Sequence, residues 1–215
     1  MTTLGRLFTK WWLNRLANGA LIMKNYPRAI QRYRQILAVD PSDAYARSVL
    51  ANVYAETGDP DSALREFTLL VEHHPDDAEA WFNLGFLQDK RDELAAAEAS
   101  FRRAVELKPS IDRAWYGLGL VLVRSGRLPE AAAAFERTIK LQPYGPFGYY
   151  QLGMTYHHMG AADRAWEVHR RLAEFEPKFS ATLKRDLQQT PPLTATTDQL
   201  SADTSSKEET TAQRE

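Results

Sequence analysis

The sequence contains no cysteine, which excludes disulfides, thiolate nucleophiles and cysteine-based zinc or iron–sulfur sites. It also lacks any run of 18 or more apolar residues, so it predicts no membrane-spanning helix. Neither sign of charge dominates, because 27 Lys and Arg residues stand against 28 Asp and Glu residues. A chain balanced in this way gives no overall reason to expect binding to nucleic acid or to an anionic membrane.

The motifs of common catalytic sites are absent as well. There is no glycine-rich phosphate loop, no G-x-S-x-G turn and no H-E-x-x-H metal motif. Four of the five histidines form two adjacent pairs, and adjacent residues on a helix point about 100° apart, which does not suit chelation of one metal ion. The sequence therefore predicts that the protein is not an enzyme and holds no metal or cofactor.

The N-terminus does not resemble a secretory signal. Arg6, Lys10 and Arg15 interrupt the apolar segment, and no small-residue cleavage site follows it. We therefore expect a cytoplasmic protein.

A period of 34 residues organises the rest of the chain. Several independent columns share it, and self-similarity at this length is the mark of a stacked array of helical repeats. The columns are Pro41, Pro75, Pro109, Pro143 and Pro177; Ala29, Ala63, Ala97, Ala131 and Ala165; Leu16, Leu50, Leu84, Leu118 and Leu152; and the rings Tyr33, Phe67, Phe101 and Phe135.

Residues 78–111 show the physical sense of one repeat. Trp81 and Leu84 lie on one face of a first helix, and Phe101 lies on the apolar face of a second. Pro109 ends the second helix, because proline lacks an amide hydrogen and clashes with the preceding turn. One such pair cannot bury its apolar face alone, so neighbouring repeats must stack.

Glycine marks the turn between the two helices in three repeats. Gly58, Gly126 and Gly160 fall where the first helix ends, a place that often needs a left-handed backbone. Pro27, Pro60 and Pro129 fall in the first turn of the second helix, where proline is tolerated.

The columns resemble the tetratricopeptide repeat (TPR), which carries Trp, Leu, Gly and Tyr in its first helix and Ala, Phe, Ala and Pro in its second. The resemblance spans roughly four fifths of the chain and implies an all-α, right-handed superhelical solenoid of about five helix-turn-helix repeats. The matching residues in the last three repeats are Trp81, Leu84, Gly85, Ala97, Phe101, Ala104, Pro109, Trp115, Leu118, Gly119, Ala131, Phe135, Pro143, Tyr149, Leu152, Gly153, Tyr156, Ala165 and Pro177.

The predicted organisation follows from these columns. Residues 1–9 form an amphipathic extension, residues 180–189 a C-terminal capping helix and residues 190–215 a disordered tail, which is rich in Thr, Ser and charge. The five repeats are assigned to residues 10–43, which are the most divergent, and to 44–77, 78–111, 112–145 and 146–179.

The resemblance implies that the first helices of the repeats line a concave groove, where related proteins bind a peptide or helix of a partner protein. The corresponding positions here are rich in aromatic side chains, which suit a binding surface. The predicted partner-binding residues are Tyr45, Asn52, Phe82, Phe86, Lys90, Arg113, Tyr116, Leu120, Arg124, Phe147, Tyr150, Met154 and His157. The sequence does not identify the partner.

Two alternatives concern the N-terminal end, where residues 1–39 hold seven basic and no acidic side chains. Leu7, Phe8, Trp11 and Trp12 could contact a membrane surface or a partner, which would make the protein a membrane-peripheral assembly factor. They could also cap the first repeat, or the groove could be filled by this helix or by a second copy in a homo-oligomer. Nucleic acid is not expected, because the acidic second repeat interrupts any basic track.

Overall fold

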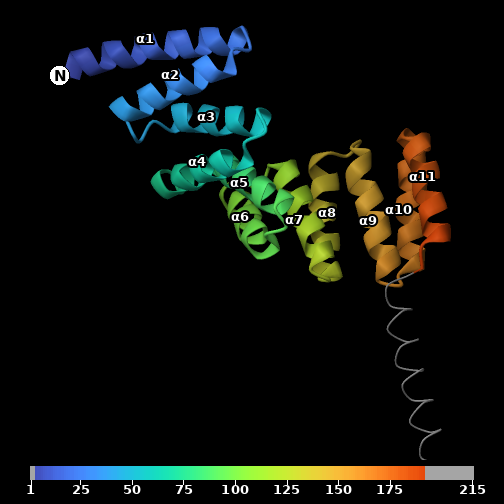
Figure 1. Cartoon of the computed structure of the whole chain (residues 1–215). Coiled ribbons are helices and arrows are strands. Elements are labelled where there is room, and N and C mark those ends of the chain that lie inside the picture. The colour runs from blue at the N-terminus through green and yellow to red at the C-terminus, as the bar shows by residue number, and fades with distance from the viewer. Residues whose placement is uncertain (1–2, 192–215) are drawn as a thin grey trace, which may run out of the picture. The chain divides into compact units, whose positions relative to one another are not determined.

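The computed structural model describes residues 3–191, in which there are eleven helices and no strand (Figure 1). The chain divides into two compact units, Met1–Pro109 and Ser110–Glu215, each of which is considered by itself. This architecture confirms the predicted all-α repeat fold. The predicted disordered tail lies, from residue 192 onward, outside the described residues.

The first unit consists of three helix pairs, α1 with α2, α3 with α4 and α5 with α6, and each pair also packs on the next. Its first helix is continuous from residue 3, so the predicted extension at residues 1–9 and the first helix of the first repeat form one element as far as they are described. The helices are α1 Thr3–Ile22, α2 Tyr26–Val39, α3 Ala44–Glu56, α4 Pro60–His73, α5 Ala78–Lys90 and α6 Leu94–Leu107.

The ring and alanine columns form the core of this unit. Tyr33 and Phe67 are buried, and beside them Ala29 and Ala63 are fully buried. The small alanines allow the paired helices to approach, and each large side chain that leaves water stabilises the fold by about 1.5–3 kcal/mol.

Aspartates begin three of these helices. The Oδ1 atoms of Asp43, Asp59 and Asp77 accept hydrogen bonds from backbone N–H groups three residues later, at 2.9, 3.0 and 3.0 Å. Each bond satisfies a donor that the helix itself cannot pair, which contributes about 1 kcal/mol.

The second unit repeats the arrangement and adds a terminal helix. Helix α7 pairs with α8, α9 pairs with α10, and α11 packs against both α9 and α10. The helices are α7 Asp112–Arg124, α8 Leu128–Leu141, α9 Pro146–His158, α10 Ala162–Phe175 and α11 Pro177–Gln189.

Glycine permits two close approaches in this unit. A Cβ atom at Gly119 of α7 would lie 2.5 Å from the ring of Phe135 on α8, and one at Gly153 of α9 would lie 2.9 Å from the side chain of Leu183 on α11. Both large side chains are fully buried. The terminal helix therefore packs on α9 as Phe135 packs on α7, with a side chain set against a bare backbone.

A left-handed residue stands at the turn within each of the five helix pairs. The predicted left-handed backbone is confirmed at the three glycines, Gly58, Gly126 and Gly160, whose φ angles are 80°, 73° and 74°. The same place holds Lys24 at φ 53° and Asp92 at φ 64°. These two residues accept a conformation that costs a side-chain-bearing residue about 1–2 kcal/mol, because the packed helices on either side fix the turn.

Within residues 3–191, no helix is both long enough and apolar enough to cross a membrane.

Candidate functional site

A pocket of about 560 Å³ opens in the second unit between α7, the end of α8 and the start of α9. Arg113 and Tyr116 of α7 and Phe147 of α9 line it, and all three belong to the predicted partner-binding residues. The remaining lining residues are Asp112, Thr138, Gln142, Gly145 and Gly148.

The aromatic walls of this pocket are held in place by neighbouring rings. The half-buried Tyr116 ring meets the ring of Phe135 edge-on at 5.8 Å, and the Phe147 ring meets that of Phe179 at 5.2 Å. Phe147 nevertheless leaves 62% of its surface exposed. A fixed aromatic wall beside a cation and a carboxylate suits an apolar side chain of a polypeptide with polar groups on either side.

Gly148 brings the two sides of this pocket together. A Cβ atom there would lie 3.2 Å from Ile139 of α8, so a larger residue would push the start of α9 away. The Thr138 hydroxyl donates a hydrogen bond to the Ala134 carbonyl at 3.2 Å and is thus occupied within its own helix. Recognition in the pocket therefore depends on the rings and on the charged groups at its edge.

Other predicted residues of the second unit contact the chain itself. The Tyr150 hydroxyl donates to Asp186 Oδ2 of α11 at 2.7 Å, and His157 Nε2 lies 2.6 Å from the Thr190 carbonyl oxygen. Burial, with this bond, raises the pKa of Tyr150 to about 12, while the same bond lowers the pKa of Asp186. Terminal helix α11 therefore engages part of the predicted set, whereas Leu120 and Met154 are half-buried and Arg124 is exposed.

In the first unit, four predicted residues are exposed, namely Tyr45, Asn52, Phe86 and Lys90. The Lys90 ammonium lies 5.4 Å from the centroid of the Phe86 ring, a cation–π geometry. Phe82 differs from the expectation, because only 9% of its surface is exposed and its ring packs 6.1 Å from that of Phe101. A buried Phe82 offers little surface to a ligand.

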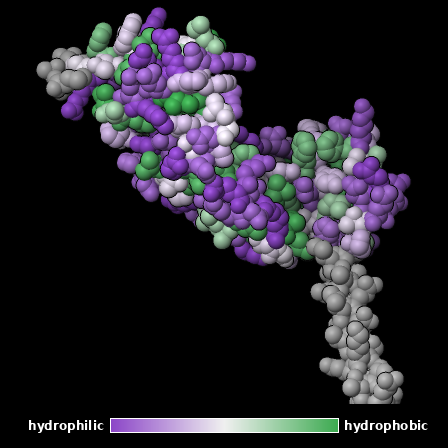
Figure 2. All heavy atoms as spheres, viewed as in Figure 1, coloured by the Kyte–Doolittle hydropathy of each residue, from purple (hydrophilic) through white to green (hydrophobic). Residues whose placement is uncertain are grey.

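The apolar residues predicted for the N-terminal helix are all exposed. Leu7, Phe8, Trp11 and Trp12 leave 61%, 67%, 55% and 49% of their surfaces in solvent. Figure 2 shows hydrophobic residues at the surface beside the N-terminal end of the described chain. Lys10 points elsewhere, since its ammonium lies 2.7 Å from both Asp40 and Asp43, hydrogen bonds that raise its pKa.

The pocket residues that the sequence did not predict come from outside the first helices. Thr138 and Gln142 belong to the end of α8, and Gly145 belongs to the turn after it. The only signal for them was their position next to the Pro143 column. Among residues 3–191, no three His, Asp or Glu side chains are grouped so that they could hold a metal ion.

Two tetratricopeptide repeat family models match residues 20–85 and 87–146, together more than half of the chain. No curated protein sequence matches it. Among solved structures, MamA is 28% identical, with a TM-score of 0.74 over 79% of this chain and 93% of that chain. YrrB, described as a TPR protein with an unusual peptide-binding site, is 24% identical, with a TM-score of 0.70 over 79% and 88% of the two chains.

The PilF protein of Pseudomonas aeruginosa is 22% identical, with a TM-score of 0.69 over 85% of this chain and 84% of that chain. At the identities of YrrB and PilF, the likeness shows the fold alone.

Proposed function

Because this chain belongs to the tetratricopeptide repeat family, whose members serve as protein-interaction scaffolds, we propose that it binds a peptide or helix of a partner protein in the pocket between α7, α8 and α9. One observation carries the proposal: Arg113, Tyr116 and Phe147, far apart in the sequence and each predicted as a partner contact, line a single pocket. Binding makes and breaks no covalent bond.

The chemistry of the pocket indicates which part of a partner it takes. Tyr and Arg are the residue types that dominate binding energy in protein interfaces, and a rigid ring loses little conformational freedom on binding. Phe147 is exposed enough to cover an apolar side chain, and Tyr116 is fixed from behind by Phe135. An amphipathic segment that inserts one large apolar side chain fits this surface best.

The test compares two variants for capture of partners from a lysate of the source cells. Truncation of two anchors costs about 1–2 kcal/mol each, so Tyr116→Ala/Phe147→Ala should lower recovery of the specific partner by about 10- to 100-fold. Tyr144→Ala is the matched control, because Tyr144 is 79% exposed and does not line the pocket. Equal helicity of all variants must be established first. Equal recovery by the wild type and the double variant would overturn the proposal.

A second candidate function is a membrane-peripheral assembly factor. The observation that favours it is the exposure of Leu7, Phe8, Trp11 and Trp12 on one helix, within a segment of residues 1–39 that has no acidic side chain. Exposed Trp and Phe beside basic residues are typical of helices that lie in the interface of an anionic bilayer.

Co-sedimentation with vesicles distinguishes this candidate. The full chain should sediment with phosphatidylserine-containing vesicles and less with pure phosphatidylcholine vesicles, because the basic end adds electrostatic attraction. Phe8→Ser/Trp11→Ser should weaken sedimentation at least about tenfold, since each ring loses more than 1 kcal/mol of burial. The control Phe86→Ser alters an equally exposed ring of α5. If both variants sediment like the wild type, the N-terminal helix does not bind membranes.

A further inference from the structure

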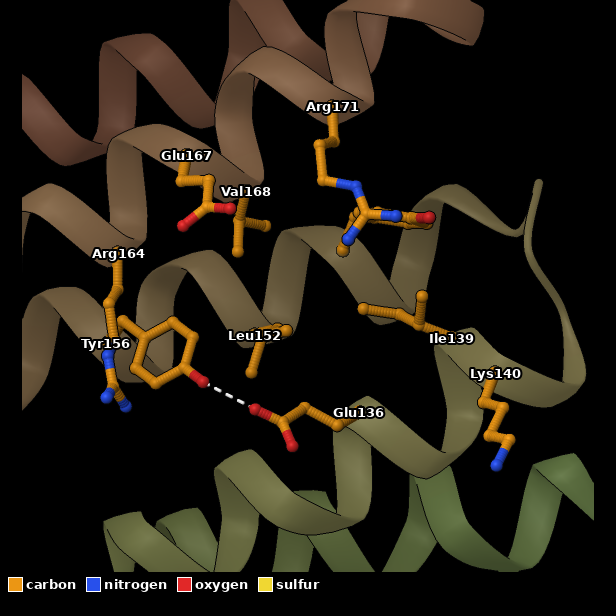
Figure 3. A pocket seen from close by; sticks show the side chains of 10 residues that line it. Glu136, Ile139, Lys140, Leu152, Tyr156, Arg164, Glu167, Val168 and Arg171 are labelled. Carbon is orange, nitrogen blue, oxygen red and sulfur yellow. Dashed lines mark hydrogen bonds between the residues drawn. The ribbon is translucent and has the colours of Figure 1, made fainter.

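A second pocket in the C-terminal unit lies between α8, α9 and α10 and shares no residue with the pocket proposed above to bind a partner. Its volume is about 520 Å³. Leu152 of α9 and Val168 of α10 are buried in its floor, and the half-buried Ile139 of α8 adjoins them (Figure 3). The floor is therefore aliphatic, while charged side chains surround it.

One side of this pocket is saturated by its own contacts. The Tyr156 hydroxyl donates to Glu136 Oε1 at 2.6 Å, and the Arg164 guanidinium lies 5.5 Å from the centroid of the Tyr156 ring (Figure 3). Burial, assisted by the bond to Glu136, raises the pKa of Tyr156, so the phenol keeps its proton and remains the donor. Glu136 and Arg164 thus have partners within the protein.

The other side carries two cations without a counter-ion. Figure 3 shows Lys140 of α8 and Arg171 of α10 beyond Ile139, on the side away from Tyr156 and Arg164. Neither side chain forms an ion pair with any carboxylate in the part of the chain that the structure describes, and neither does Glu167, the second acid of the lining. Cations held beside an aliphatic floor form an incomplete electrostatic arrangement.

The preceding repeat supplies the comparison. The residue 34 positions before Lys140 is Glu106, which pairs with Arg103 at 3.3 Å, and the residue before Arg164 by the same interval is Glu130, which pairs with Arg127 at 2.6 Å. These positions are acidic and neutralised there, whereas they are basic here. The unpaired cations are therefore particular to this pocket and not a feature of the repeat.

We propose that this pocket binds an acidic segment of a partner protein, namely one carboxylate side chain next to a large aliphatic one. Lys140 and Arg171 receive the carboxylate, and the aliphatic group covers Ile139, Leu152 and Val168. Hydrogen bonds between charged groups are about twice as strong as neutral ones, and the apolar neighbour lowers the local dielectric. The carboxylates of Glu136 and Glu167 on the rim disfavour a ligand of higher negative charge, such as a phosphate group.

The probe is the capped tetrapeptide acetyl-Ala-Leu-Asp-Ala-amide, added to the full ¹⁵N-labelled chain and followed by amide chemical shifts. Shifts should change around the pocket in α8, α9 and α10. Replacing the aspartate of the probe by asparagine, or its leucine by glycine, should raise Kd about tenfold, because each change removes one of the two contacts. If the probe containing glycine binds as well as the probe containing leucine, the interaction is only electrostatic and the proposal is wrong.

Matched protein variants locate the site. Lys140→Ala/Arg171→Ala should raise Kd at least about tenfold, because both charged contacts are lost. Arg137→Ala/Arg170→Ala removes the same charge from the same two helices, outside the pocket lining, and should leave Kd unchanged. Tyr116→Ala/Phe147→Ala should also bind the probe normally, which separates this site from the other pocket. Equal weakening by both charge variants, or loss in the Tyr116 and Phe147 variant, would overturn the assignment.

Discussion

Replacing Phe135 by alanine is expected to lower the free energy of unfolding by about 3–5 kcal/mol. The Phe135 ring is fully buried, lies against the backbone of Gly119 and supports the ring of Tyr116 at 5.8 Å. Its removal leaves a cavity that α7 and α8 cannot close without moving. Urea denaturation followed by circular dichroism measures the loss as a lower midpoint at an unchanged slope.

Two further measurements sharpen this expectation. Tyr144→Ala, on an exposed ring of the same unit, should change the free energy of unfolding by less than about 0.5 kcal/mol. Below the denaturation midpoint, Phe135→Ala should also weaken partner binding, because Tyr116 loses its support. A destabilisation below about 1 kcal/mol would mean that neighbouring side chains fill the space, contrary to the close packing described.

Replacing Leu183 by alanine is expected to lower the free energy of unfolding by about 2–5 kcal/mol and to loosen the terminal helix. Leu183 is fully buried in α11, and its side chain occupies the space that the missing Cβ of Gly153 leaves open. When α11 loosens, the bond from Tyr150 to Asp186 is lost with it. Hydrogen exchange should accelerate for the amides of α11 before those of α7 and α8.

The neighbouring exchange Lys184→Ala provides the control, because Lys184 is exposed on the same helix. It should leave both stability and exchange within experimental scatter, since exposed substitutions away from special contacts change stability by less than about 0.5 kcal/mol. If Leu183→Ala and Lys184→Ala behave alike, α11 is not held by its apolar face.

The fold could be predicted because its main determinants are local and recur along the chain. Columns such as Ala97, Phe101 and Pro109 specify a helix pair, and the period of 34 residues specifies the stacking. The left-handed turns were predictable at Gly58, Gly126 and Gly160. They were not predictable at Lys24 and Asp92, because the residue type gives no signal where the surrounding helices impose the conformation.

The site was predictable only in part, because exposure depends on contacts that the repeat pattern does not encode. Arg113, Tyr116 and Phe147 line one pocket, as their shared position in the repeat led us to expect. Phe82 occupies the same column as Tyr116, yet it is buried and packs near Phe101. Tyr150 lies one repeat further on, where α11 provides a carboxylate for it.

The pocket of Lys140 and Arg171 could not have been found from the sequence at all. Its residues come from three helices, and the decisive property is that two cations lack counter-ions in the described part of the chain. A sequence shows charges but not their distances. Only the folded helices reveal that Glu136 is engaged by Tyr156 and that Lys140 has no such partner.

The common register of the turns and rings has an evolutionary consequence. A duplication or deletion of 34 residues ahead of α11 would preserve every column, including the buried rings and the left-handed turns. Any other insertion inside a helix would rotate the later side chains by about 100° per residue and expose the core. Helix α11 already covers the face of α9 and α10 on which a further pair could stack. Variation in length is therefore expected in whole repeats, inserted between the two ends and not added beyond the last.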